Sequence, residues 1–503
     1  MLFSSTVFLF LFLPGVLALY FVVRPELRNA VLLGASILFY AWGEAPWLIL
    51  TSVAINYAMG LWVERVRERR AAKAVLAACV VINLALIGTF KYGNFLASNL
   101  NSALAPLRLP PLTVGHIALP LGISFFTFHA MSYVVDIYRG QARAMRNPLD
   151  MALYIALFPQ LVAGPIIRYH EIWEQFRSRR VTADGFAYGV RRFVTGLGKK
   201  MLIANTVATA ADGVFSTPAA QLGTAAAWLG AGCYTLQIYY DFSGYSDMAI
   251  GLGRMFGFRF PENFDYPYAS ASVTAFWRRW HMTLSNWFRD YLYVPLGGNR
   301  RGPARTYANL LIVFALCGLW HGASWTFIAW GLYHGTFLVA ERLWSRRSAR
   351  AGAAAATVPA SDGPLAAPLP PPPAARLGFG ALGHLYTLLV VIVGWVLFRA
   401  DSFGQAVAML SAMAGFPGRA AAQVDPRTFL TNEMLIVIAV GIVGSLPWLR
   451  TLRHAADAAD ARATRLAAGL LNFGGVVAVL VIFVASAAKL AAGTHNPFIY
   501  FRF

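Results

Sequence analysis

Apolar runs of roughly 20 residues recur along almost the whole chain, and they constrain its fold more than any other feature. A helix rises about 1.5 Å per residue, so each run is long enough to cross a hydrocarbon core about 30 Å thick. Hydrophobic residues make up 58% of the 503 residues and charged residues only 13%, which excludes a typical soluble enzyme. The period-two alternation of a transmembrane barrel is absent from the runs. The sequence therefore predicts an all-α polytopic membrane protein with roughly ten or more transmembrane helices.

The first predicted span is Met1 to Val23, which lacks the basic start and the small-residue cleavage site of a signal peptide. Basic segments at 168–180 and 191–200 interrupt the alternation of spans and loops, so we expect interfacial or re-entrant helices there. No internal repeat suggests the two halves of a transporter. The other predicted spans cover residues 29–43, 45–63, 74–96, 117–138, 149–167, 380–400, 434–450 and 466–490.

Basic residues outnumber acidic ones, 42 against 22, for a formal charge of +20. In a protein with many spans, Lys and Arg gather in short cytoplasmic loops, so we interpret the excess as topology rather than as nucleic-acid binding. A cytosolic polyanionic substrate would also be attracted by such loops. The basic loops Glu64 to Lys73 and Arg139 to Arg146 are separated by an even number of predicted spans. Both are predicted to be cytoplasmic, which places the N-terminus outside.

We predict a single membrane domain in three parts. Residues 1–345 form the transmembrane core, and its polar motifs fall between about 225 and 345. Residues 346–376 change abruptly to an Ala-rich and then Pro-rich tract, which predicts a flexible loop, and residues 377–503 hold the last helices. The three cysteines lie inside apolar runs without pairing or metal-ligand spacing, so we expect small core residues and no metal site.

The first polar motif, Tyr239 to Asp247, places Asp241, Tyr245 and Asp247 directly after an apolar run. Ionisable groups at membrane depth are expensive and are functional candidates when they cluster. Two interpretations stay open. The motif is either a polar network that orders a broken helix or part of the wall of a substrate tunnel.

The second motif runs from Phe276 to Gly298 and mixes aromatic, basic and polar residues. On one continuous helix, Trp277, His281, Leu284 and Phe288 would share a face, with Arg278 and Arg289 elsewhere. Such a helix would rest at the cytoplasmic interface with its arginines toward anionic groups. The alternative is an aromatic and basic interfacial belt without a catalytic part.

The third motif, Cys317 to Trp325, places His321 inside an apolar run beside small residues. A buried neutral imidazole can accept a proton near physiological pH, although a lone histidine in such a run is often only bonded to a neighbouring helix. Gly318 and Gly322 would allow either backbone or ligand to approach closely. His334 is a weaker candidate of the same kind.

Together with the tail Asn496 to Phe503, these three motifs resemble the membrane-bound O-acyltransferase family. Within that family they are most similar to the bacterial branch typified by the membrane subunit of alginate O-acetyltransferase. The resemblance covers nearly the whole chain, and only the Pro-rich insertion near 351–375 departs from it.

The resemblance implies a multi-helix fold around a central tunnel, in a bacterial inner membrane, that binds acyl-CoA from the cytosol. His321 matches the near-invariant histidine of the family, and His281 matches its second catalytic position. In this branch, acetyl passes across the membrane to a polysaccharide hydroxyl with a periplasmic, serine-hydrolase-like partner. The resemblance implies acetyl-CoA as a substrate and no permanently bound cofactor.

Acyl transfer needs a base, which His321 can supply, and oxyanion donors, which His281, Asn286 or backbone amides can supply. The phosphates and adenine of coenzyme A are expected to meet basic and aromatic side chains. The acceptor stays open between an alginate-like exopolysaccharide, peptidoglycan and cellulose. An ion-coupled transporter and a structural scaffold are the alternatives from other classes. The expected substrate-binding residues are Trp277, Arg278, Arg279, Asn286, Arg289, Asp241, Tyr245 and Asp247.

Overall fold

The structure, a computed structural model, describes residues 1–115, 117–353, 380–420, 422–448 and 463–493. Every regular element in this part of the chain is a helix, which confirms the all-α prediction. The chain divides into two compact units, which are described separately below. Unit 1 comprises Met1–Thr206, Ile238–Glu262 and Arg465–Phe503, and unit 2 comprises Val207–Gln237 and Asn263–Thr464. The aromatic tail Asn496 to Phe503 lies outside the described residues.

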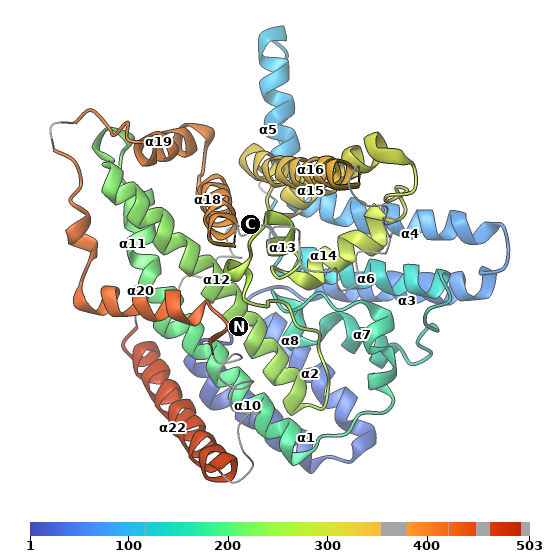
Figure 1. The fold of residues 1–503 in the computed structure, drawn as a ribbon. Coiled ribbons are helices and arrows are strands. Elements are labelled where there is room, and N and C mark those ends of the chain that lie inside the picture. Colours follow the sequence, from blue (N-terminus) through green and yellow to red (C-terminus); the bar gives the residue numbers. More distant parts are fainter. Residues whose placement is uncertain (116, 354–379, 421, 449–462, 494–503) are drawn as a thin grey trace. The chain divides into compact units, whose positions relative to one another are not determined.

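Unit 1 is built from the N-terminal helices, the C-terminal half of α12 and the last helix (Figure 1). Helices α3, α4 and α6 pack against one another, and α2 packs on α7. The elements are η1 (Phe8–Phe12), α1 (Leu13–Val22), η2 (Pro25–Leu27), α2 (Arg28–Ala41), α3 (Trp47–Val66), α4 (Ala71–Ile87), η3 (Gly88–Tyr92), α5 (Gly93–Leu104), η4 (Ala105–Leu107), α6 (Ile123–Tyr138), α7 (Pro148–Ala156), α8 (Phe158–Leu161), α9 (Tyr169–Ile172), η5 (Trp173–Phe176), α10 (Ala183–Gly198), η6 (Lys199–Ala204), α12 (Thr224–Met255) and α22 (Ala463–Ala491).

Unit 2 contains the segment that carries the two motif histidines. Helices α15 and α16 form an antiparallel pair, and α18 packs on α16. The elements are α11 (Asn205–Phe215), η7 (Ala219–Gln221), the first part of α12, η8 (Pro267–Ala269), α13 (Val273–Trp277), α14 (Met282–Phe288), η9 (Arg289–Tyr293), α15 (Gly302–His321), α16 (Trp325–Ala353), α18 (Gly380–Arg399), α19 (Phe403–Met413), η10 (Pro426–Phe429) and α20 (Asn432–Gly444).

Five helical stretches among the described residues are long and apolar enough to cross a membrane. They are Trp47–Val66, Ala71–Leu107, Gly302–His321, Gly380–Arg399 and Phe473–Ala491. Inside unit 1, the side chains of Asn56 on α3 and Asn83 on α4 exchange two hydrogen bonds of 3.1 and 2.9 Å. Polar pairs of this kind hold helices together where lipid supplies no hydrophobic driving force.

Glycines allow the close packing of α15 on α16. A Cβ at Gly318 would lie 2.1 Å from the carbonyl oxygen of Phe327, and one at Gly331 would lie 2.1 Å from that of Phe314. The two backbones can approach this closely only without side chains at those positions. The small residues next to His321 therefore serve helix packing.

Two predicted segments differ from the structure. The run 149–167 does not form one spanning helix, because α7 ends at Ala156 and the four-residue α8 follows with Pro159 in its first turn. From Met151 to Ile167, all residues except Ala152 are buried in the protein instead. Helix α16 continues to Ala353 through Ala and Arg, which favour helix, so residues 346–353 of the predicted loop 346–376 are helical. The remainder, 354–376, lies outside the described residues.

Candidate active site

The structure brings His281 and His321 together inside unit 2. Their ring centroids are 6.4 Å apart, and their exposed fractions are 1% and 5%. His321 is the last residue of α15, and His281 occupies the turn that precedes α14. Two buried imidazoles, distant in sequence, therefore meet at one point.

The segment around His281 is not the continuous helix that its periodicity predicts. Helix α13 ends at Trp277, α14 begins at Met282, and His281 between them has a φ of 45°. The reason is tertiary: the backbone amide of Met282 donates to Asn263 O (3.0 Å), and that of Asp265 donates to Arg279 O (3.0 Å). These bonds replace the helical ones that local periodicity would form. The left-handed conformation costs a non-glycine residue about 1–2 kcal/mol.

Asn263 organises this turn, although the sequence analysis did not single it out. Its Oδ1 accepts hydrogen bonds from the Thr283 amide (3.3 Å), the Thr283 hydroxyl (2.8 Å) and Nδ1 of His281 (3.1 Å). Asn263 is 1% exposed. It lies in an irregular stretch between two helical segments, where no periodicity marks a residue as functional.

These bonds assign the tautomer of His281. The Thr283 amide can only donate, so the atom of Asn263 that faces it is the carbonyl oxygen, and the same oxygen cannot donate to an imidazole. His281 therefore carries its proton on Nδ1 and presents the Nε2 lone pair. Burial, and secondarily the nearby His321, lowers the pKa of His281 well below its ordinary value near 6.5. His281 is thus neutral at physiological pH, and its Nε2 is a hydrogen-bond acceptor.

Aromatic rings surround His321. Its ring centroid lies 5.2 Å from that of Trp330 on α16 and 5.3 Å from that of Phe398 on α18. A Cβ at Gly322 would meet the ring of Phe327 at 2.2 Å, so a ring of α16 occupies that space. The walls around the imidazole are apolar, which strengthens any electrostatic interaction made there.

His334 lies on α16, fully buried, and is separated from His321 by Trp330. Its ring centroid is 5.4 Å from that of Trp330 and 5.1 Å from that of Trp277. The predicted binding residue Trp277 is buried too, against Trp330 at 5.6 Å. Trp330 therefore contacts His321, His334 and Trp277.

The predicted phosphate-binding residues differ in their surroundings. Arg278 is partly buried in the turn before His281, and within the described residues its Nε has no hydrogen-bond partner. Arg289 is bound by its neighbour Asp290 through contacts of 2.6 and 3.0 Å. Arg279 and Asn286 are partly buried. Arg278 is therefore the better placed of these cations to meet an anionic ligand.

The predicted residues Asp241, Tyr245 and Asp247 belong to unit 1. Asp241 pairs with Lys200 at 2.7 Å, with 3% and 1% of the side chains exposed. Asp247 pairs with Arg192 at 2.6 Å and with Lys199 at 2.7 Å, and the ring of Tyr245 stacks on Phe3 with centroids 4.6 Å apart. These contacts connect α12 to α10 and η6. They favour the interpretation of the motif as a polar network that orders the helix. Their place in a tunnel wall stays a prediction.

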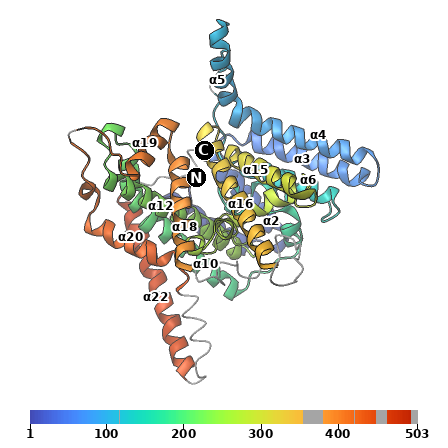
Figure 2. The same ribbon diagram turned by 45° about the horizontal axis from the view of Figure 1, so that its top comes forward.

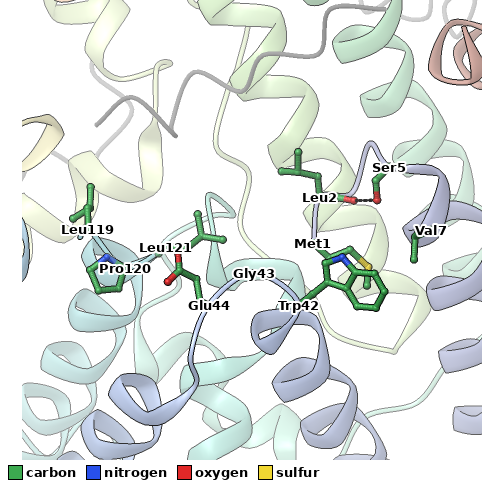
Figure 3. Close-up of a pocket in the computed structure, with 11 residues that line it drawn as sticks. Met1, Leu2, Ser5, Val7, Trp42, Gly43, Glu44, Leu119, Pro120 and Leu121 are labelled. Carbon is green, nitrogen blue, oxygen red and sulfur yellow. Dashed lines mark hydrogen bonds between the residues drawn. The ribbon is translucent and has the colours of Figure 1, made fainter. Parts of the chain in front are cut away.

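Unit 1 also contains a cavity of about 560 Å³ (Figure 3). Three segments line it: the N-terminal residues 1–7, the α2–α3 turn and the residues just before α6. Its polar groups include the carboxylate of Glu44 and the hydroxyl of Ser5, which donates to Leu2 O at 2.8 Å. The exposed indole of Trp42 forms one side.

The paired histidines suit acyl transfer chemically. One buried imidazole can take the proton of a hydroxyl as it attacks, and polar groups of the turn can meet the developing oxyanion. Among the described residues, no three His, Cys, Asp or Glu side chains lie close enough to hold a metal ion. The fold and site define a polytopic helical membrane protein with a buried histidine centre.

Comparison with known proteins agrees with this class. Residues 119–360 match the membrane-bound O-acyltransferase family. The chain is 41% identical to a probable alginate O-acetylase of Azotobacter vinelandii and 41% identical to one of Pseudomonas putida, with all of each chain covered. It is 34% identical to a peptidoglycan O-acetyltransferase of Helicobacter pylori, over 83% of this chain and 80% of the relative. The chain belongs to the membrane-bound O-acyltransferase family, and it is an O-acyltransferase.

Proposed function

We propose that this enzyme takes acetyl from acetyl-CoA on the cytosolic side of a bacterial inner membrane and delivers it for O-acetylation of an exported polysaccharide. The observation that carries the proposal is the buried pair of His281 and His321. The relatives that match over the full chain are named for acetylation of alginate, a polysaccharide.

In the proposed reaction, His321 takes the proton of the acceptor hydroxyl. At the same time, the hydroxyl oxygen forms a bond to the carbonyl carbon of the thioester. The carbon–sulfur bond then breaks, and the leaving thiolate takes up the proton from His321. The tautomer of His281 does not suit the role of oxyanion donor that the sequence predicts for this residue. Neutral His281 has no proton on Nε2 to give to an oxyanion, so it would accept a hydrogen bond from a substrate donor other than the attacking hydroxyl and thereby position the substrate. Asn286 or backbone amides would supply the oxyanion donors.

Coenzyme A binding is proposed at the turn that precedes His281. The partly buried guanidinium of Arg278 would pair with a phosphate, because a buried cation is stable only when an anion compensates it. Arg279 and Arg289 would add charge at the same place, and Trp277 would line the route to the histidines. No other cofactor is proposed, and acetyl-CoA is a substrate.

The proposed topology puts the basic loop Glu64 to Lys73 in the cytosol and the N-terminus in the periplasm. A periplasmic, serine-hydrolase-like partner would complete transfer to the sugar hydroxyl. The peptidoglycan O-acetyltransferase among the relatives makes peptidoglycan a second candidate acceptor, with the same chemistry. Cellulose would be acetylated in the same way.

The test uses purified protein, acetyl-CoA labelled on the acetyl group, and alginate with a periplasmic extract as the acceptor. Thioester consumption is measured for wild type, His321→Ala and the control His384→Ala, which changes an exposed histidine of unit 2. We expect consumption by wild type and the control and none by His321→Ala. Equal turnover by all three would refute the base assignment, and movement of an intact substrate without consumption would favour a transporter. Acceptor identity is then tested by replacing alginate with peptidoglycan or cellulose in the same assay.

A further inference from the structure

An arm leaves the α3–α4–α6 group of unit 1 and stands apart from it in both views (Figures 1 and 2). We define the arm as residues 93–121, of which residue 116 is not described. It consists of α5, the short η4 and an extended return segment that leads to α6. No residue of α5 is buried. The arm is therefore not part of the protein core.

Two asparagines make the arm a defined structure. The Asn94 side chain donates to Ile117 O (2.8 Å) and accepts from Ile117 N (3.2 Å). The Asn101 side chain does the same with Leu112, at 3.1 and 2.7 Å. Each amide thereby satisfies both backbone groups of one residue of the return segment, as a neighbouring strand would. The return segment is held along one face of α5.

The helix before the arm already spans a bilayer. Helix α4 and η3 contain 17 and 5 residues, together about 33 Å at about 1.5 Å per residue, against a hydrocarbon core about 30 Å thick. Helix α4 begins at Ala71, inside the basic segment Glu64 to Lys73, and its neighbour α3 ends at Val66 in the same segment. The ring of Trp47, the first residue of α3, lies 5.9 Å from that of Phe90 in η3. Helix α5 therefore begins at the membrane surface opposite the basic loop.

One side of the arm exposes several large apolar side chains. Leu96, Leu100 and Leu107 share the side of the helix away from the two asparagines and are 60%, 47% and 67% exposed. The return segment adds Leu109, Leu112, Val114 and Leu119, which are 40% to 51% exposed. The arm contains one charged residue, Arg108, at the turn, and no acidic residue. Water is an unfavourable environment for such a surface.

We propose that the arm lies in the headgroup region of the leaflet opposite the basic loop Glu64 to Lys73, with its leucines in the acyl chains. The occupant of the leucine face is lipid, because the arm continues a spanning helix, starts at the membrane surface and carries almost no charge. The return segment runs directly into residues 119–122, which form one wall of the 560 Å³ cavity. The arm thus holds that wall at the level of the interface. The inference does not depend on the proposed acceptor or donor.

Single nitroxide labels test the proposal in the full chain reconstituted in phosphatidylcholine vesicles. One pair of sites, Leu96→Cys and Leu100→Cys, replaces exposed leucines, and a matched pair, Ser98→Cys and Ser102→Cys, replaces exposed serines of the same helix. The three native cysteines are buried and do not compete for the label. Accessibility to oxygen, which is enriched in lipid, is compared with accessibility to a water-soluble nickel chelate.

We expect the leucine-site labels to favour oxygen over the chelate by at least fivefold relative to the serine-site labels. Equal and high exposure of all four sites to the chelate would overturn the proposal, since it would place the arm in water and make its apolar face a site for a protein partner.

Discussion

Substitution of Asn263 tests the assignment of the histidine tautomer. In Asn263→Ala, three donors lose their acceptor: the Thr283 amide, the Thr283 hydroxyl and Nδ1 of His281. A typical bond contributes about 1 kcal/mol net, and a buried unsatisfied donor costs about 1–3 kcal/mol. For three donors we therefore expect a loss of at least about 3 kcal/mol of stability. The left-handed turn at His281 keeps the backbone bond from the Met282 amide to Asn263 O but loses the contacts of the Asn263 side chain.

The same change acts on turnover. Without its partner on Nδ1, His281 can move its proton to Nε2, and about 1.4–2.8 kcal/mol of lost bonding corresponds to a roughly 10- to 100-fold decrease in kcat. The assay is thioester consumption, with the exposed Asn432→Ala as the matched control. Wild-type kcat in folded Asn263→Ala would refute the positioning role.

Asn263→Asp separates positioning from stability. A carboxylate keeps the acceptor for all three donors but adds a negative charge beside His281, which favours the imidazolium and raises its pKa. Because the neutral form is the active one, the acid limb of the pH–kcat profile should move to higher pH. A merely structural role of Asn263 would leave that limb in place.

Three further predictions concern other parts of the protein. Arg278→Gln should raise the KM for acetyl-CoA more than it lowers kcat, measured by initial rates, and an unchanged KM would place coenzyme A elsewhere. Gly318→Ala should lower stability by about 1–3 kcal/mol, because its Cβ would lie 2.1 Å from a backbone carbonyl of α16. Gly232→Ala, whose Cβ meets nothing within 4 Å, is its control in thermal unfolding, and equal Tm values would contradict the packing argument. Because burial lowers the pKa of His281 in the folded protein, the unfolded chain binds more protons below pH about 6.5. The free energy of unfolding should therefore decrease as the pH falls through that value. His281→Gln should weaken this pH dependence.

Much of the fold could be predicted because lipid imposes a simple rule on the sequence. Long apolar runs must form helices when no water is present to satisfy backbone groups. The runs that became α3, α18 and α22 follow that rule. The run at 149–167 does not, since Pro159 interrupts it and protein rather than lipid surrounds it. Hydropathy measures apolar character and does not distinguish these two environments.

The candidate site was only partly predictable. His321 stood out inside an apolar run and His281 in a motif of aromatic and basic residues, and the structure places their rings 6.4 Å apart. Asn263 had no such signal, because its importance depends on three donors that reach it only after the chain folds back. Asp241 had the same signal as the histidines, yet its carboxylate pairs with Lys200. A residue type alone does not indicate which partner will satisfy it.

By itself, the sequence determined that this chain is a helical membrane protein and which residues carry ionisable groups into it, because burial in lipid depends on composition summed over a helix. Tertiary structure alone decided the break before His281, the tautomer of its ring and the packing of α15 on α16. These depend on contacts between segments far apart in the chain, such as the bond from the Met282 amide to Asn263 O. Such contacts outweigh local helical periodicity because they satisfy the same backbone groups in a different way.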